Sequence, residues 1–470
     1  MSAVRASRFG SWGRLIVVCL LAACDVTTDT IGHDNAAATA SAMPSSMPTS
    51  MPSSMPTSTP SSMPTTTPTS VPTDMPPDMP PPEKPSLTAL TGPQEYPNPF
   101  HDVLGKTYDE IDKHVKDAFE QLFHGKDDET IYYPLGDDAA TIRDIYHSGE
   151  SRSEGFGLAM LIAVELGKQD EFDRLWTQAK KPYRMGEKNT GLRYDSGPNE
   201  GYFTSNCDTP EGSASCIDPY GMEQFAMALV FAHDLWGDSG RIDYEADALD
   251  LLNVMKNKEE LNGGVVEGVL GFFDAETHLT FDEPKLEVAV QTRPSVLMPA
   301  YYALWAEATG DDFWLQGADA SRDFFPAVAD TKTGLMPLRA YFDGRPVPDS
   351  DTFTPETYRV FLNIVLDEIW LHGNPSGVPA CNKILSFFSD VGIDKYVGNY
   401  SLDGKPLSTG REYALVVANG VAAAISKNAD RKDYIQAVWD QDLPTGNNRY
   451  YTGILQLFAL LVLSGKMQVL

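Results

Sequence analysis

Apolar residues recur at the helical spacing of three and four positions along most of the chain after residue 93. The pattern predicts about twelve helices. Their predicted ranges are residues 111–122, 155–167, 172–179, 221–235, 246–254, 295–308, 313–328, 357–370, 380–388, 412–425, 434–438 and 451–463. Stretches with the character of a strand are few and short, for example 265–270 and 287–291. The chain is therefore predicted to fold as an all-α domain.

The loops between these helices alternate in length. Long loops such as 188–218 and 339–355 are rich in Gly, Pro, Asn and aromatic residues, whereas short ones such as 310–312 only turn the chain. An even number of helices in antiparallel pairs favours a closed α/α barrel, whose long loops gather at one end and form the site. The alternative is an open α-solenoid, but the sequence shows no strong repeat that would support one.

The first residues have a different character. Basic residues precede a short apolar run at 15–24, which is typical of a secretory signal and too short to span a bilayer. The end of this run, Leu-Ala-Ala-Cys, resembles a bacterial lipobox, and that resemblance implies cleavage before Cys24 and lipidation of its thiol. The alternative is an ordinary signal peptide in which Cys24 is incidental. We expect residues 1–23 to be a signal peptide and the exported protein to be anchored to a bacterial membrane by lipid alone.

Residues 24–92 are dominated by Ser, Thr, Pro and Met in degenerate repeats such as SSMPTS. A segment of this composition cannot bury a core, so we expect a disordered, extended linker. No second low-complexity boundary follows, and residues 93–470 are predicted to form one domain.

Charge and cysteine content narrow the possible partners. The formal net charge of −30 argues against nucleic acid, which requires a basic footprint, and is compatible with a neutral substrate. Cys207 and Cys216 flank a short loop and could form a disulfide, which would leave Cys381 as an unpaired, buried thiol. The cysteines and histidines lack the spacing of a metal site, so no metal or cofactor is expected. We expect a monomer.

Glu154 stands out among the acidic residues. It follows Ser153 and begins an apolar, glycine-containing helix. Its carboxyl group would therefore lie at the N-terminal end of that helix, where a substrate could reach it. The simpler interpretation is that Glu154 only interacts favourably with the helix dipole, as acidic residues in first turns commonly do.

Several segments, taken in order, resemble glycoside hydrolase family 8. They are residues 153–160 (SEGFGLAM), 223–237, 299–305, 341–344, 358–367 and 450–455. The resemblance extends from about residue 98 to residue 470 and is most similar to the xylan-cleaving branch, which includes reducing-end xylose-releasing enzymes. It implies an (α/α)6 barrel, an inverting mechanism and Glu154 as the general acid.

The resemblance fails at the second catalytic group. Inverting hydrolases need another carboxylate to activate water on the opposite face of the sugar. Where xylan-cleaving relatives usually carry Asp, this chain has Tyr220, Arg293 and Glu356. An arginine cannot act as a base. We take Asp218 as the first candidate base. The other acidic residues near Arg293 are Asp282, Glu283 and Glu287.

Sugar binding requires aromatic faces and planar hydrogen-bonding groups. The residues expected to contact substrate are Arg152, Tyr202, Tyr220, Arg293, Glu356 and Arg359. Further stacking candidates in the long loops are Tyr194, Phe203 and Tyr341, although core packing is the commoner role for each. Four tryptophans with apolar neighbours at helical spacing are predicted to lie in the core, namely Trp176, Trp236, Trp305 and Trp370. If Arg293 lay beside Glu154, it would lower the pKa of that acid.

These observations favour an inverting glycoside hydrolase that cleaves β-1,4-linked polysaccharide or oligosaccharide, with xylan or xylo-oligosaccharide as the expected substrate. The alternative is a catalytically impaired, cell-surface glycan-binding protein on the same barrel. The order of segments favours the enzyme, and the missing Asp at position 293 favours the alternative.

Overall fold

The computed structural model describes residues 96–470, with gaps at 148, 186, 206–216, 239 and 373–374. The signal peptide, Cys24, the linker and the pair Cys207 and Cys216 lie outside the described residues. The expectations for them therefore stay predictions.

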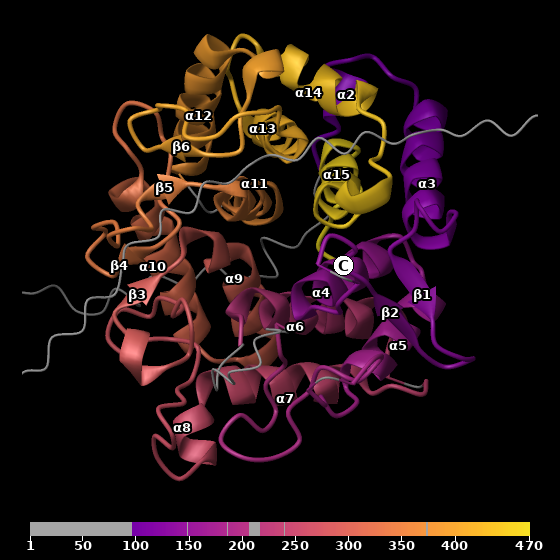
Figure 1. Cartoon of the computed structure of the whole chain (residues 1–470), viewed down its shortest axis with the longest axis vertical. Helices are drawn as coiled ribbons and strands as arrows, with labels where there is room; N and C mark the ends of the chain where they lie inside the picture. Colours follow the sequence, from indigo (N-terminus) through magenta and orange to yellow (C-terminus); the bar gives the residue numbers. More distant parts are fainter. Residues whose placement is uncertain (1–95, 148, 186, 206–216, 239, 373–374) are drawn as a thin grey trace, which may run out of the picture. The chain divides into compact units, whose positions relative to one another are not determined.

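Twelve helices of ten residues or more form two concentric rings in the described part of the chain (Figure 1). The inner ring consists of α4 (Ser153–Glu165), α6 (Pro219–Trp236), α9 (Pro299–Thr309), α11 (Arg359–Leu371), α13 (Tyr413–Ile425) and α15 (Tyr451–Leu463). Each inner helix contacts the next, and α15 contacts α4, which closes the ring. The outer helices are α3 (Tyr108–His124), α5 (Gln169–Ala179), α7 (Tyr244–Lys256), α10 (Phe313–Val328), α12 (Gly377–Val391) and α14 (Arg431–Asp440). The predicted (α/α)6 barrel is confirmed.

Composition separates the two rings. The inner helices α13 and α15 are apolar on nearly every side and are buried along almost their whole length. A helix that is hydrophobic all round must be enclosed by others. The outer helix α3 has one apolar face, and its first turn is held by a capping box between Thr107 and Glu110. The sequence thus contains the information that places each helix in the inner or outer ring.

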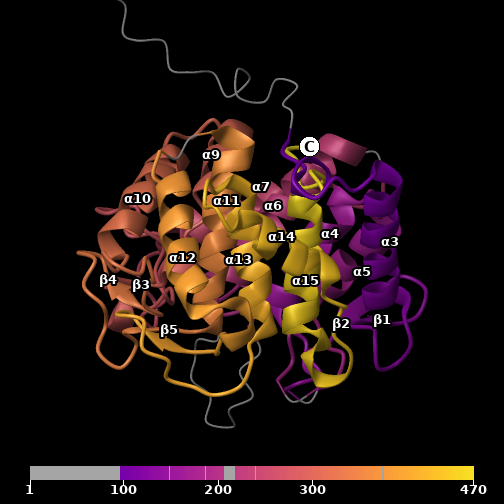
Figure 2. The ribbon, with the colours of Figure 1, turned by 90° about the horizontal axis from the view of Figure 1, so that it is seen from above.

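The inner helices direct their N-termini toward the same end of the barrel, and the outer helices run the opposite way (Figure 2). This arrangement follows from alternating inner and outer helices along one chain. Residues at or just before the start of an inner helix, such as Glu154, Glu356 and Tyr451, consequently meet at one end. The barrel therefore gathers residues that are far apart in sequence.

Three short antiparallel strand pairs tie the loops at this end. They are β1 (Tyr132–Pro134) with β2 (Ala140–Ile142), β3 (Gln291–Thr292) with β4 (Ala340–Tyr341), and β5 (Thr352–Phe353) with β6 (Tyr400–Ser401). The second and third pairs lie directly beside Arg293 and Glu356 in sequence. They restrict where these two side chains can lie.

Both predicted strands are wrong. In 265–270 only isolated bridges form, because Glu267 and Gly268 have φ angles of 52° and 75°, which turn the chain back on itself. In 287–291 the chain begins as a 3₁₀ turn, Leu286–Val288, and only Gln291 pairs as a strand. The helix predicted at 295–308 starts later, at Pro299, because a separate 3₁₀ turn, Pro294–Val296, precedes it.

The predicted core residues are found inside the barrel walls. Trp176, Trp305 and Trp370 are buried, and Trp236 packs against the core at its edge. Cys381 is a free, buried thiol, as predicted, and burial raises its pKa to about 12. Among the described residues, no helix is both long and apolar enough to cross a bilayer.

The contact between α4 and α6 leads to a stability prediction. A Cβ atom at Gly157 would lie 2.5 Å from Cβ of Gln224 and 2.9 Å from the carbonyl oxygen of Gly221. We expect Gly157→Ala to destabilise the domain by about 1–3 kcal/mol, because overpacking outweighs the better helix propensity of alanine. A fall of at least about 2 °C in the apparent Tm measures this effect. Gly240→Ala is the control, because a Cβ there meets no atom within 4 Å. Equal Tm values for the two variants would contradict the close packing.

Candidate active site

A cleft of about 1260 Å³ opens where the N-termini of the inner helices meet. Its walls come from the start of α4, the turn before α11, and the segments before α13 and α15. Polar and aromatic residues dominate the lining, including Asp144, Tyr146, Arg152, Glu154, Glu356, Arg411, Glu412, Tyr413, Asn447, Tyr450 and Tyr451. A cleft of this size and chemistry suits several sugar units.

Glu154 lies in the first turn of α4 and reaches the cleft with 21% of its side chain exposed. Its Oε2 accepts a hydrogen bond of 2.5 Å from Nη1 of Arg359. Burial raises the pKa of Glu154 and outweighs the opposing charge of Arg359, while the nearby carboxylates of Asp218 and Glu356 raise it further. The surroundings of Glu154 thus favour its protonated form more than water does, whereas the start of a helix favours the ionised form.

Arg359 is the first residue of α11 and only 1% exposed. Its guanidinium lies 4.0 Å from the ring centroid of Tyr220, which stacks beneath it. Its Nη2 lies 3.7 Å from Oε2 of Glu356. One guanidinium therefore contacts both Glu154 and Glu356.

Arg293 lies within a group of three carboxylates. Its Nη2 is 2.5 Å from Asp218, its Nε is 2.6 Å from Asp282 and its Nη1 is 3.0 Å from Glu356. Among the described residues Arg293 makes no ion pair with Glu154, whose partner is Arg359. Arg293 therefore does not pair with Glu154, which was the arrangement in which it would have lowered the pKa of this acid.

The three carboxylates around Arg293 differ in how far they reach solvent. Asp282 has 2% of its side chain exposed and also binds Arg339. Asp218 is 15% exposed, caps α6 by accepting a hydrogen bond from the backbone of Tyr220, and does not line the cleft. Glu356 is 52% exposed and lines the cleft beside Glu154.

The other sugar-binding candidates are distributed between the cleft and the core. Tyr202 is fully buried, its hydroxyl donates to the backbone of Leu270, and its ring packs on Phe272, so its predicted contact with substrate is wrong. Tyr220 is 1% exposed and reaches the site only by supporting Arg359. Arg152 lines the cleft, where it pairs with Asp144 at 3.2 Å.

Sequence reasoning missed the exposed aromatic residues of the cleft. Tyr146 and Tyr413 line it and are 68% and 47% exposed. Tyr146 lies in a polar loop and Tyr413 at the start of a helix, so neither has a pattern that separates it from other surface tyrosines. Tyr450 also lines the cleft, and its buried hydroxyl has no hydrogen-bond partner among the described residues.

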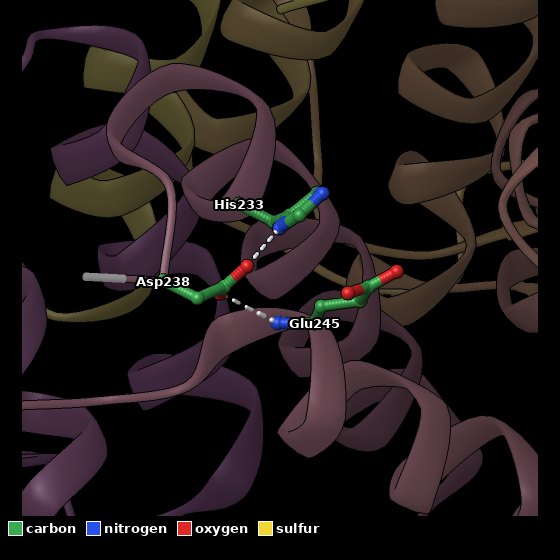
Figure 3. Close-up of side chains that lie close together, drawn as sticks. All are labelled: His233, Asp238 and Glu245. Atoms are coloured by element: carbon green, nitrogen blue, oxygen red, sulfur yellow. Dashed lines mark hydrogen bonds and ion pairs between the residues drawn. The ribbon is translucent and has the colours of Figure 1, made fainter. Parts of the chain in front are cut away.

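A possible metal-binding group lies elsewhere. In the described part of the chain, His233, Asp238 and Glu245 have ligand atoms within 4.8 Å of one another. Figure 3 shows that Asp238 is hydrogen-bonded to Nδ1 of His233 and to the backbone nitrogen of Glu245. His233 is in the last turn of α6, roughly 22 Å along the helix from Asp218 at 1.5 Å per residue. We interpret the group as a connection between α6 and α7.

Comparisons with known proteins agree with this geometry. The sequence profile of glycosyl hydrolases family 8 matches residues 141–465. The reducing-end xylose-releasing exo-oligoxylanase Rex8A of Paenibacillus barcinonensis is 32% identical over 378 residues, which cover 78% of this chain and 94% of the relative. Endoglucanase 2 of Ruminiclostridium josui is 26% identical over 326 residues. The matched region covers 69% of this chain and 65% of the endoglucanase. The solved structure of Rex8A complexed with xylose is 32% identical in sequence and matches with a TM-score of 0.71 over 80% of this chain and 97% of that chain.

The comparisons do not support the alternative of an impaired glycan-binding protein, because the relatives are named as hydrolases. The resemblance seen in the sequence is confirmed over most of the folded part. The chain belongs to glycosyl hydrolases family 8, and it is an O-glycosyl hydrolase on that family's (α/α)6 barrel.

Proposed function

We propose that this protein hydrolyses β-1,4-linked xylo-oligosaccharides with inversion at the anomeric carbon, and that Glu154 is the general acid. The observation that carries the proposal is the position of Glu154, a carboxyl group with a raised pKa at the wall of a cleft large enough for several sugars. The names of the relatives that are 32% identical support the choice of xylo-oligosaccharide.

In this mechanism Glu154 protonates the glycosidic oxygen as its bond to the anomeric carbon breaks. The raised pKa keeps the proton in place until the leaving oxygen needs it. The exposed rings of Tyr146 and Tyr413 offer faces for sugar stacking, and the free hydroxyl of Tyr450 offers a hydrogen bond to a sugar hydroxyl.

We also propose that the enzyme is exported and held at a bacterial membrane through lipid on Cys24. The proposal rests on the basic and apolar character of residues 1–23 and on the Leu-Ala-Ala-Cys motif. We expect Cys24→Ser to move the full-length protein from the membrane fraction to the soluble fraction of a bacterial host. Retention of this variant in the membrane would contradict anchoring through Cys24.

Removal of the acid tests the proposed function. We expect Glu154→Gln to lower kcat on xylotriose by about 10²–10⁴-fold, because a glutamine cannot donate the proton. Chromatography of released xylose measures the rate, and NMR of fresh wild-type product should show the inverted anomer. Glu165→Gln is the matched control, since Glu165 is buried at the far end of the same helix and its hydrogen bond to the backbone of Gln468 survives the change. A retained anomer, or unchanged turnover by Glu154→Gln, would refute the proposal.

The raised pKa of Glu154 predicts the alkaline side of the pH profile. The acid must be protonated, so kcat/KM on xylotriose should hold its plateau just below the pKa of Glu154 and fall as the pH rises through that value. A β-xylobiosyl fluoride, whose fluoride leaves without protonation, should lack this alkaline limb. The two substrates assayed over the same pH series provide the measurement. An identical alkaline limb for both would assign the limb to another group.

A further inference from the structure

A second group of ionisable side chains lies at the end of α6 that is remote from the catalytic cleft. It consists of His233 in the last turn of α6, Asp238 in the connection to α7, and Glu245 in the first turn of α7 (Figure 3). We propose that these three side chains bind a divalent transition-metal cation, for which Zn²⁺ is the best fit, and that the cation joins the two helices. The proposal does not depend on the proposed glycoside hydrolysis.

The ligand atoms are already close to a coordinating arrangement. One ligand atom from each of the three residues lies within 4.8 Å of the other two. In a tetrahedral Zn²⁺ site with bonds of roughly 2.0–2.1 Å, neighbouring ligand atoms lie roughly 3.3 Å apart. His233 and Asp238 are partly exposed and Glu245 is exposed, so small side-chain rotations can close the remaining gap. Three protein ligands leave a fourth position for water.

The imidazole distinguishes this group from an ordinary acidic patch. Mg²⁺ and Ca²⁺ prefer oxygen ligands, whereas Zn²⁺ and related transition-metal ions bind imidazole nitrogen together with carboxylate oxygen. The expectation that this chain binds no metal rested on the spacing of its cysteines and histidines. Two of the three ligands proposed here are carboxylates, which that criterion does not consider.

Asp238 is held in the orientation that a metal ligand needs. Its Oδ1 accepts a hydrogen bond of 3.1 Å from the backbone nitrogen of Glu245, and its Oδ2 lies 2.5 Å from Nδ1 of His233. Hydrogen bonds of the first kind orient metal-binding carboxylates in proteins. A cation would take the place of the proton between His233 and Asp238, so the two side chains would remain connected.

The adjoining cavity has an excess of acidic groups. It has a volume of about 520 Å³ and lies between α6, α7, α9 and residues 469–470. His233 and Glu245 line it together with Asp234 and Glu307, and no lysine or arginine is among its described lining residues. Within the described part of the chain, Asp234 and Glu307 make no hydrogen bond or ion pair. A divalent cation would supply the positive charge that this region lacks.

The cation would act on stability and not on catalysis. The group lies roughly 22 Å along α6 from Asp218, so it cannot contact a substrate in the cleft. Its ligands belong to the end of one helix and the start of the next, and they come together only in the folded chain. A metal that binds the folded state and not the unfolded state stabilises the fold by mass action.

Calorimetry and thermal unfolding of the full chain, prepared without a histidine tag, test the proposal. After treatment with a chelator and removal of the chelator, Zn²⁺ should bind at one saturable site and raise the apparent Tm by about 2–5 °C. Mg²⁺ at the same concentration should leave the Tm unchanged. Absence of saturable Zn²⁺ binding, or an equal effect of Mg²⁺, would overturn the proposal.

Two variants identify the ligands. His233→Gln and Glu245→Gln should each weaken Zn²⁺ binding at least about tenfold and remove the rise in Tm. His124→Gln is the matched control, because His124 pairs with Glu171 at 3.0 Å and is exposed to a similar degree, 39% against 35% for His233, but lies on α3 outside this group. Unchanged affinity in both test variants, or an equal loss in His124→Gln, would refute the assignment.

Co²⁺ gives a readout that does not depend on stability. It replaces Zn²⁺ in sites of this kind, and the wild-type protein should show a visible absorption band on binding Co²⁺ that both His233→Gln and Glu245→Gln lack. Circular dichroism in the presence of a chelator shows whether each variant is folded, and either folded variant is sufficient for the test. A band of equal intensity in a folded variant would exclude the substituted residue as a ligand.

Activity separates this proposal from the proposed function. Turnover of xylotriose by His233→Gln and by chelator-treated wild-type protein should be unchanged at temperatures well below the Tm. A loss of turnover that Zn²⁺ restores to the wild-type protein would contradict a purely stabilising cation. Glu154→Gln should lose turnover and still bind Zn²⁺, so failure of the hydrolase proposal would leave the metal site intact, and failure of the metal site would leave the hydrolase intact.

Discussion

The site depends on pairing guanidinium groups, two of them buried, with carboxylates at the N-terminal end of the inner ring. Moving a charge out of water costs several kcal/mol, and a buried ion is tolerated when opposite charges and hydrogen bonds surround it. The guanidinium groups belong to Arg293, Arg339 and Arg359, and the carboxylates belong to Glu154, Asp218, Asp282 and Glu356. The members come from segments that are far apart in sequence, including the start of α4, the start of α6 and the start of α11, and the closed barrel brings these segments together.

The same network shifts the pKa values of two neighbouring carboxyl groups in opposite directions. Glu154, Asp218 and Glu356 lie at or beside helix starts, where the dipole favours ionisation. The pKa of Glu154 is nevertheless raised, because burial is the largest effect on this carboxyl group and Arg359 is the guanidinium that pairs with it. Glu356 is more exposed and has two guanidinium groups within reach. For Glu154 and Glu356, local burial and the number of cationic neighbours therefore account for pKa shifts in opposite directions.

The sequence predicts the barrel better than it predicts the site. Helical periodicity and apolar composition identify the twelve helices, because burial against neighbours requires these patterns in any packed bundle. The partners of Arg293 come from three different loops, and no local pattern links residues 218, 282 and 356. The burial of Tyr202 depends on Phe272, which is also remote in sequence. Contacts across the barrel therefore cannot be predicted from the sequence and are seen only in the structure. The position of Glu154 at a helix start can be predicted from the sequence alone.

The charge at position 293 constrains the evolution of this cluster. An aspartate here would lie beside Asp218, Asp282 and Glu356, and these groups would lose the guanidinium that binds all three. Arg339 contacts only Asp282 among them, so most of the repulsion would remain. Conversion between this arrangement and one with a carboxylate at position 293 therefore requires changes at neighbouring acidic residues as well. Tyr220 is compatible with the same constraint. Its aromatic ring packs beneath Arg359 and adds no negative charge to a region that already holds several carboxylates.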